Sequence, residues 1–296
     1  WKRVLERGKT TMNGPHQGGW IHTKYGEDWF IHFQDKGPYG RVCHLQPVDW
    51  SSGWPVMGNA GEPYWKFRKP KSDSKTIVNP VETDEFDSSK LGMQWQWQND
   101  YKESYGQATS MGFFRLFTYA LPELGDVSNL WYVPNMLLQK TPADEFTATT
   151  KLSFCSRNSD QYVGLVCMSA EYSSVGLQRT EDGYELQIRH NPNAMRTHLT
   201  DEVLTVDTLK PTQKGTPRKG RPAEMHIKDV YLRMSIKDSK VNYAYSIDGK
   251  KWKKAGGEYA MGKGRWIGSK IGFFAVDPNK TGRKGFIDID WFRISR

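Results

Sequence analysis

The sequence predicts an all-β protein with two parts: a run of short strands typical of propeller blades or sandwich hairpins, then a larger two-sheet sandwich of jelly-roll type. Three observations carry this prediction. Of the 296 residues, 13% are aromatic and 28 are glycine, which favours strands and turns over helices. Apolar and polar residues alternate along much of the chain. The Asp248-Gly249 pair between two alternating segments is a strong hairpin signal.

Short strands are predicted first, over residues 1–65. Each is four to seven residues long and is bounded by Gly, Pro or Asp. Four or five such strands without a covering helix form about one propeller blade and part of another, and they cannot bury their own faces. The predicted strands are Lys2–Leu5, Gly19–Thr23, Asp28–Gln34, Gly40–Leu45 and Trp54–Gly58.

Residues 66–83 lack the alternation of apolar and polar residues that marks the predicted strands before them. The segment Lys66–Lys75 is charged and shows no apolar period. We expect an interdomain linker here, laid over a surface through the apolar anchors Trp65, Phe67 and Ile77.

The alternation of apolar and polar residues is clearer from residue 84 to residue 296. This region shows no apolar residues at helical spacing and no internal repeat. Many short strands separated by regular turns predict the two-sheet sandwich. The predicted strands are Met93–Gln98, Gly112–Phe117, Asn135–Gln139, Phe146–Phe154, Tyr162–Cys167, Ser174–Arg179, Tyr184–His190, Val230–Lys237, Lys240–Ser246, Gly272–Ala275 and Gly285–Arg293.

The net charge of +9 raises the question of a nucleic-acid partner. Much of the excess lies in Lys210–Lys228, where prolines interrupt the basic residues and no nucleic-acid motif is present. An exposed loop explains this segment better than a nucleic-acid site. No stretch is long and apolar enough to span a membrane. We therefore expect neither nucleic acid nor a membrane as a partner.

The three cysteines, Cys43, Cys155 and Cys167, show no metal-binding spacing and cannot all pair with one another. Cys155 and Cys167 lie in predicted strands and are interpreted as small core residues.

The segment Gly14-Pro15-His16 predicts a stiff loop that carries one histidine. Gly18-Gly19 follows, and a predicted hairpin begins there. Proline removes backbone freedom before the histidine, and glycines permit close approach of another backbone or of a ligand. This arrangement suits a side chain aimed at a crowded centre. The alternative is a histidine on a surface loop, and this stretch alone does not exclude it.

Many pieces of the chain, taken in order, carry a resemblance to one family. In the first part they are Gly14–Trp20, Trp29–Asp35, Gly37–Arg41, Leu45–Trp50 and Gly53–Val56; in the second they are Asp84–Phe86, Leu91–Trp97, Asn135–Lys140, Glu145–Thr149, Gly164–Val166, Arg265–Gly268 and Ile287–Phe292. The first set resembles the end of the catalytic five-bladed β-propeller of glycoside hydrolase family 43, in its β-xylosidase/α-L-arabinofuranosidase branch. The second set resembles the concanavalin A-like β-sandwich appended to those enzymes.

The resemblance implies three substrate-binding residues. His16 matches the histidine on the propeller axis beneath the sugar, which commonly contacts a water or a calcium ion. Arg41 matches the arginine that reaches the sugar hydroxyls; its alternative role is an ion pair with Asp35 at a strand end. Trp266 matches an aromatic residue that a sandwich loop places at the mouth of the pocket; its alternative role is in the sandwich core.

The catalytic groups of that family have no match in this chain. The resemblance implies a general-base Asp, a general-acid Glu and a modulating Asp, all in earlier blades and therefore upstream of Trp1. Glu27, Asp28, Asp35 and Asp49 match none of these motifs. Because Trp1 lies inside a predicted strand and open blades expose unpaired edges, we expect an N-terminal part, either as a separate chain or as a segment ahead of Trp1.

The function implied is an exo-acting, inverting glycosidase, a β-xylosidase and/or α-L-arabinofuranosidase, acting on xylo-oligosaccharides or arabinoxylan. The alternative is a non-catalytic carbohydrate-binding sandwich module. A periplasmic or secreted location is favoured, and a homo-oligomer is left open.

No cofactor is required by the implied mechanism. Glu85 and Asp290, with Asp288, supply oxygens at the start and finish of the sandwich and are candidate calcium ligands. The alternative is that these acids form the solvent-facing side of a strand.

Overall fold

The computed structural model describes residues 2–15, 17–121, 129–195, 200–264 and 266–296. Strands dominate these residues, and the two short helices among them are the 3-10 turns η1 (Gly37–Tyr39) and η2 (Leu130–Tyr132). None of the described helices has the length and apolar character needed to cross a bilayer. The chain divides into two units, residues 1–79 with 265–268, and residues 80–264 with 269–296.

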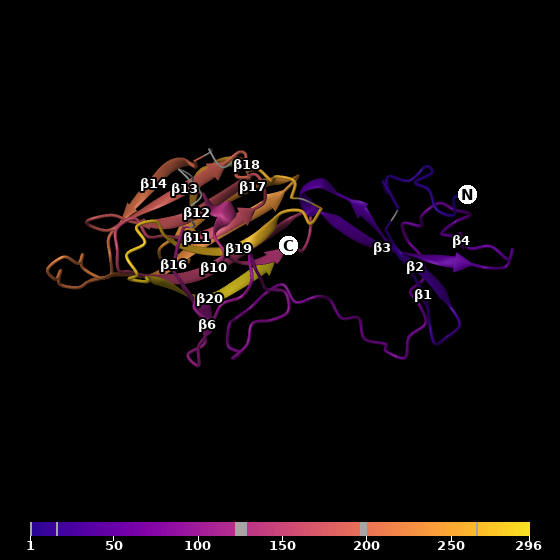
Figure 1. The fold of residues 1–296 in the computed structure, drawn as a ribbon, viewed down its shortest axis with the longest axis horizontal. Helices are drawn as coiled ribbons and strands as arrows, with labels where there is room; N and C mark the ends of the chain where they lie inside the picture. Colours follow the sequence, from indigo (N-terminus) through magenta and orange to yellow (C-terminus); the bar gives the residue numbers. More distant parts are fainter. Residues whose placement is uncertain (1, 16, 122–128, 196–199, 265) are drawn as a thin grey trace. The chain divides into compact units, whose positions relative to one another are not determined.

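The first unit contains one four-stranded antiparallel sheet in the order β1-β2-β3-β4 (Figure 1). The sheet is a simple meander, which is the composition of one propeller blade. Its strands are β1 (Gly19–His22), β2 (Asp28–Asp35), β3 (Arg41–Asp49) and β4 (Val56–Met57).

Both faces of this sheet carry exposed apolar side chains. Ile31 and Leu45 pair directly across β2 and β3 and are 38% and 37% exposed. Trp20 pairs with Phe30, whose side chain lies on the opposite face from that of Ile31, and Trp20 is 58% exposed. A blade presents both of its faces to neighbouring blades in this way.

The predicted strand Lys2–Leu5 is wrong, because these residues belong to no strand. Their backbone makes isolated hydrogen bonds instead, from Met57 N to Val4 O at 3.3 Å and from Glu6 N to Gly61 O at 2.8 Å. The segment therefore lies beside β4 and the turn after it, without forming a regular strand pairing.

Residues 66–75 belong to the first unit and contact its sheet. The Glu27 carboxylate accepts hydrogen bonds from the Arg68 guanidinium at 2.6 Å and from the Lys71 backbone N–H at 2.9 Å. The Phe67 ring meets the buried Trp29 edge-on at 5.9 Å. The division between the two units falls at residue 79/80, inside the predicted linker of residues 66–83.

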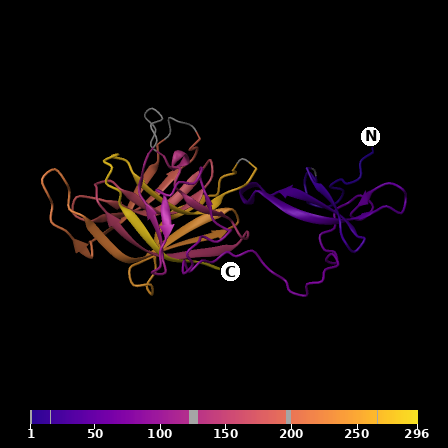
Figure 2. The same cartoon turned by 60° about the horizontal axis from the view of Figure 1, so that its bottom comes forward.

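The second unit is a sandwich of two eight-stranded sheets, with β10 and β20 central to one sheet and β11 and β19 central to the other (Figures 1 and 2). This arrangement confirms the predicted all-β class and the two-sheet sandwich.

The first of these sheets has the order β18-β17-β16-β10-β20-β7-β6, with β15 beside β16. Its strands are β6 (Gly106–Ala108), β7 (Phe114–Phe117), β10 (Phe146–Ser156), β15 (Gln213–Lys214), β16 (Met225–Lys237), β17 (Lys240–Ser246), β18 (Lys253–Ala260) and β20 (Phe286–Ser295).

The other sheet has the order β14-β13-β12-β11-β19-β9-β5, with β8 parallel to β19. Its strands are β5 (Gln96–Trp97), β8 (Tyr119–Ala120), β9 (Leu137–Lys140), β11 (Tyr162–Met168), β12 (Tyr172–Arg179), β13 (Tyr184–Asn191), β14 (Glu202–Leu209) and β19 (Lys270–Asp277).

Alternation places the sandwich core between these sheets. Every second residue of β10 from Phe146 to Phe154 is buried. Buried tyrosines also join the sheets, because Tyr184 Oη donates to Met225 O and Tyr243 Oη donates to Ser173 O, each at 2.7 Å. A buried hydroxyl without such a partner would cost about 1–3 kcal/mol.

The sequence prediction missed β6, β8, β14, β15 and β18. Of these, β14 is mostly exposed and β18 contains Lys253, Lys254 and a Gly-Gly pair, so neither shows the apolar alternation that marks a half-buried strand.

We expect Gly164→Ala to destabilise the sandwich by about 1–3 kcal/mol, because a Cβ there would lie 2.2 Å from Val175 O in the adjacent strand. Gly257→Ala is the matched control, since a Cβ at that position would have no atom within 4 Å and the backbone there is not left-handed. The measurement is urea unfolding of both variants. Equal stability of the two would contradict the close packing of β11 on β12.

Candidate functional site

Arg41, at the start of β3, is the centre of the candidate site in the first unit. Its Nη1 donates to Gln17 Oε1 at 3.1 Å. Its guanidinium carbon lies 4.2 Å from the ring centroid of Phe33 and 5.5 Å from that of Trp266. Two aromatic rings therefore hold the guanidinium, and stacking of this kind restricts its orientation while leaving its donors free.

The ion pair with Asp35 that the sequence left open is not among the described contacts. Asp35 lies opposite Arg41 in the β2–β3 register. Its carboxylate instead accepts from the Gly37 backbone N–H at 2.9 Å, which closes the turn into η1. Arg41 Nε is buried and has no hydrogen-bond partner among the described residues. An unpaired buried donor is costly, and a ligand oxygen would satisfy it.

The loop that carries Trp266 belongs to the first unit, together with Arg41. Trp266 is 68% exposed, so the alternative role of this residue in the sandwich core is wrong. Its backbone is left-handed, with φ at +64°, and so is that of Gln17, with φ at +52°. Bulky residues adopt this conformation rarely, and such strain concentrates at functional sites.

Two glycines allow this loop to reach the β2–β3 connection. A Cβ on Gly268 would lie 2.4 Å from Gly40 N and 2.6 Å from Pro38 O, and a Cβ on Gly40 would lie 2.5 Å from Ile267 O. Both glycines also have left-handed backbones, with φ at +74° and +76°. The contact is therefore one of backbone against backbone, which only glycine permits at both positions.

His16, the third residue predicted to bind substrate, lies outside the described residues. Gln17 and Phe33 were not predicted from the sequence. Phe33 could have been found, because the period of two places it on the same face of the sheet as Arg41. Gln17 could not, since its contact with Arg41 depends on the path of the loop before β1.

Carboxylates of the first unit whose pKa is displaced all shift downward, each through a local hydrogen bond. A general acid needs the opposite shift, so these groups are suited to structure and not to proton donation. The largest cause is the Lys71 backbone N–H for Glu27, the His22 ring for Asp28, the Ser51 backbone N–H for Asp49 and the Lys24 ammonium for Asp73.

The candidate calcium ligands of the sandwich all have cationic partners. Glu85 accepts from Nε and Nη2 of Arg293, both at 2.8 Å, and this pairing lowers the pKa of its carboxyl. Asp290 lies 2.9 Å from Lys151 Nζ. Asp288 is held by Arg115 at 2.7 and 2.8 Å. These carboxylates fit ion pairing better than calcium, and calcium binding by them stays a prediction.

Comparison with known proteins identifies the sandwich. Residues 83–295 match the family model GH43_C2, described as the beta xylosidase C-terminal concanavalin A-like domain. The chain belongs to this family. Relatives match beyond the sandwich as well: a putative beta-xylosidase of Xylanibacter ruminicola is 31% identical, over 91% of this chain and 46% of its own length.

Solved GH43 structures share the fold. A GH43 protein of Bacillus licheniformis superposes with a TM-score of 0.75 at 25% identity, covering 98% of this chain and 55% of its own. A xylan beta-1,4-xylosidase of Bacillus halodurans gives a TM-score of 0.77 at 18% identity, covering 100% of this chain and 56% of its own. The chain thus spans about half the length of the relatives it matches.

We expect Gly268→Ala to detach the Trp266 loop from the β2–β3 connection, because the new Cβ would collide with the backbone of Gly40 and Pro38. Gly53→Ala is the matched control: its φ of +72° imposes the same left-handed strain, of about 1 kcal/mol, but its Cβ would meet nothing within 4 Å.

The measurement is hydrogen–deuterium exchange of peptides covering residues 36–42. Exchange there should rise in the Gly268 variant and stay unchanged in the Gly53 variant. Unchanged protection in both would show that the loop does not hold this connection.

Proposed function

We propose that this chain forms part of the sugar-binding subsite, together with the accessory sandwich, of an exo-acting, inverting glycosidase that cleaves xylose or arabinofuranose from xylan-derived oligosaccharides. The observation that carries the proposal is the Arg41 guanidinium, which lies against the rings of Phe33 and Trp266 and whose buried Nε has no hydrogen-bond partner among the described residues.

This arrangement suits a sugar. The planar guanidinium can engage two adjacent hydroxyls at once, which a lysine ammonium cannot do. The exposed Trp266 ring offers a flat apolar surface to sugar C–H groups, and its indole N–H offers a donor to hydroxyls. Together they would bind and orient a glycone.

The substrate class rests on the relatives. A protein of Formosa agariphila that is 28% identical is named beta-xylosidase, and one of Bacteroides ovatus that is 23% identical is named a non-reducing-end alpha-L-arabinofuranosidase. Both sugars present similar hydroxyl patterns, so Arg41 would serve either of them.

In the proposed reaction a carboxylate base activates a water that attacks the anomeric carbon, while a carboxylic acid protonates the leaving oxygen. In inverting enzymes these groups stand about 6.5–9.5 Å apart, which leaves room for the water. We propose that the part of the protein outside these 296 residues supplies both groups, because Glu27, Asp28 and Asp49 match no catalytic motif of the family and their lowered pKa values do not suit a general acid. Arg41 would hold the sugar in line for attack.

We expect Arg41→Lys, in the full-length protein, to lower kcat/KM on aryl β-D-xyloside or aryl α-L-arabinofuranoside by about 10- to 100-fold. The reason is the loss of a charge-assisted, two-point contact worth about 1.5–3 kcal/mol. Arg68→Lys is the matched control. Arg68 also stacks on aromatic rings, Trp29 and Phe67, but it pairs with Glu27 away from the Arg41 cluster, and we expect less than about a 2-fold change.

Equal losses in the two variants would show that Arg41 acts only through the fold. Retention of the wild-type protein on insoluble xylan without turnover of either aryl glycoside would contradict the glycosidase and support a carbohydrate-binding module.

A further inference from the structure

Three side chains with metal-ligating atoms converge where β10 ends and β16 begins. Cys155 on β10 pairs directly with His226 on β16 in the antiparallel ladder. Glu224 stands two residues before His226, on the same face of the extended chain. The register of β10 and β16 therefore brings together a thiol, an imidazole and a carboxylate that are far apart in sequence.

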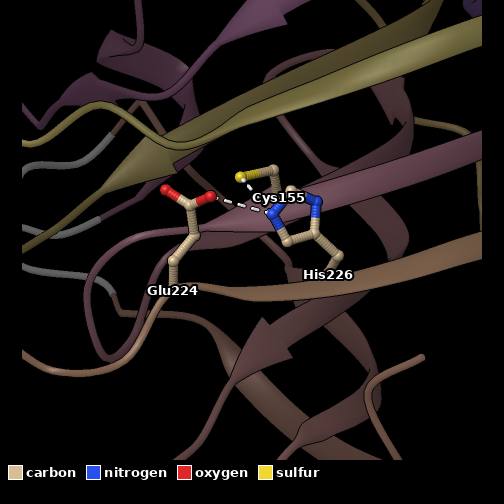
Figure 3. Close-up of side chains that lie close together, drawn as sticks. All are labelled: Cys155, Glu224 and His226. Atoms are coloured by element: carbon tan, nitrogen blue, oxygen red, sulfur yellow. Dashed lines mark hydrogen bonds and ion pairs between the residues drawn. The ribbon is translucent and has the colours of Figure 1, made fainter. Parts of the chain in front are cut away.

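The Glu224 carboxylate and the Cys155 thiol both contact the same atom, Nε2 of His226 (Figure 3). His226 Nε2 lies 2.9 Å from Glu224 Oε1 and 3.5 Å from Cys155 Sγ. Nε2 offers either one proton or one lone pair, so it can make only one of these two contacts a good hydrogen bond, and the weak S–H donor of Cys155 can point to the nitrogen or to the carboxylate. A cation between the three atoms would contact all of them at once.

The distances between the three ligand atoms are close to those in a tetrahedral zinc site. The ligand atoms lie within 4.8 Å of one another. In a tetrahedral site with Zn–S of about 2.3 Å and Zn–N or Zn–O of about 2.0–2.1 Å, neighbouring ligand atoms stand about 3.3–3.8 Å apart. The Cys155–His226 separation of 3.5 Å falls in that range, and the His226–Glu224 pair needs to open by a few tenths of an ångström.

A thiol nucleophile would require a different geometry. In a Cys–His–acid triad the acid orients the base through the other ring nitrogen, whereas Glu224 contacts the same Nε2 that faces the thiol. The cluster is built for coordination and not for attack.

The surroundings support coordination. Arg157 Nε donates to Glu224 Oε2 at 2.8 Å, which fixes the carboxylate with its other oxygen toward His226. Outer partners of this kind orient metal ligands. Cys155 and His226 also line a hollow of about 290 Å³, so an ion has a path to them.

We propose that Cys155, Glu224 and His226 bind one divalent cation of borderline softness, Zn²⁺, with a water as fourth ligand. Thiolate and imidazole select such an ion over calcium or magnesium. The ion would tie β10 to the start of β16, where the chain returns from the 210–224 segment to the sheet. The site is separate from the Arg41 cluster, which belongs to the other unit.

The test is titration of chelator-treated protein with ZnCl₂ by calorimetry. We expect saturable binding of one equivalent, and weakening by about 100-fold or more in Cys155→Ser and in His226→Gln. Two matched controls should bind as wild type: Cys43→Ser removes an exposed thiol, and His190→Gln removes an imidazole that lies between Glu171 and Glu202.

Co²⁺ provides a second readout, because a thiolate ligand gives a near-ultraviolet charge-transfer band. The band should appear in wild type and in Cys43→Ser and be absent in Cys155→Ser. Glu224→Gln, of the same shape, should keep the band but bind Zn²⁺ more weakly, so the test survives if Cys155→Ser fails to fold. No saturable binding in wild type, or equal binding in folded Cys155→Ser, would overturn the proposal.

Discussion

The close approach of two backbones, at Gly40 and Gly268, is the constraint on which the candidate sugar site depends. Neither position can carry a Cβ without collision, so the loop of Trp266 lies directly against the turn that begins β3. That contact brings the Trp266 ring to Arg41, while the alternation of β2 puts Phe33 on the same face of the sheet as Arg41. The guanidinium is thus oriented by packing before any ligand is bound, and preorganisation of this kind reduces the cost of binding.

The Cys155–Glu224–His226 cluster also depends on the backbone, in this case on the register between two strands. In the sandwich, the β10–β16 pairing sets Cys155 opposite His226, and a shift of one residue would send these side chains to opposite faces. The two clusters differ in what they offer. The Arg41 cluster presents stacked planes and free donors, which suits a neutral polyol. The Cys155 cluster presents converging lone pairs, which suits a cation.

The sequence predicted the class of the fold and most of its strands, because alternation and turn residues are local signals. It missed β14 and β18, because β14 is mostly exposed and β18 contains lysines and a Gly-Gly pair, so neither shows alternating apolar residues. Arg41 and Trp266 came from a family resemblance, and the structure unites them in one unit. Gln17 and the Cys155–Glu224–His226 group escaped prediction, because their contacts depend on a loop path and on a register between strands about 70 residues apart.

The central claim is that Arg41 binds the sugar, and a crystal structure of the full-length protein soaked with xylose or arabinose tests it most directly. The account predicts a sugar with hydroxyl oxygens within about 3.2 Å of the Arg41 nitrogens, Nε among them, and with the Trp266 ring beside it. A sugar bound with its hydroxyls away from Arg41, or seated only on the sandwich, would contradict the account.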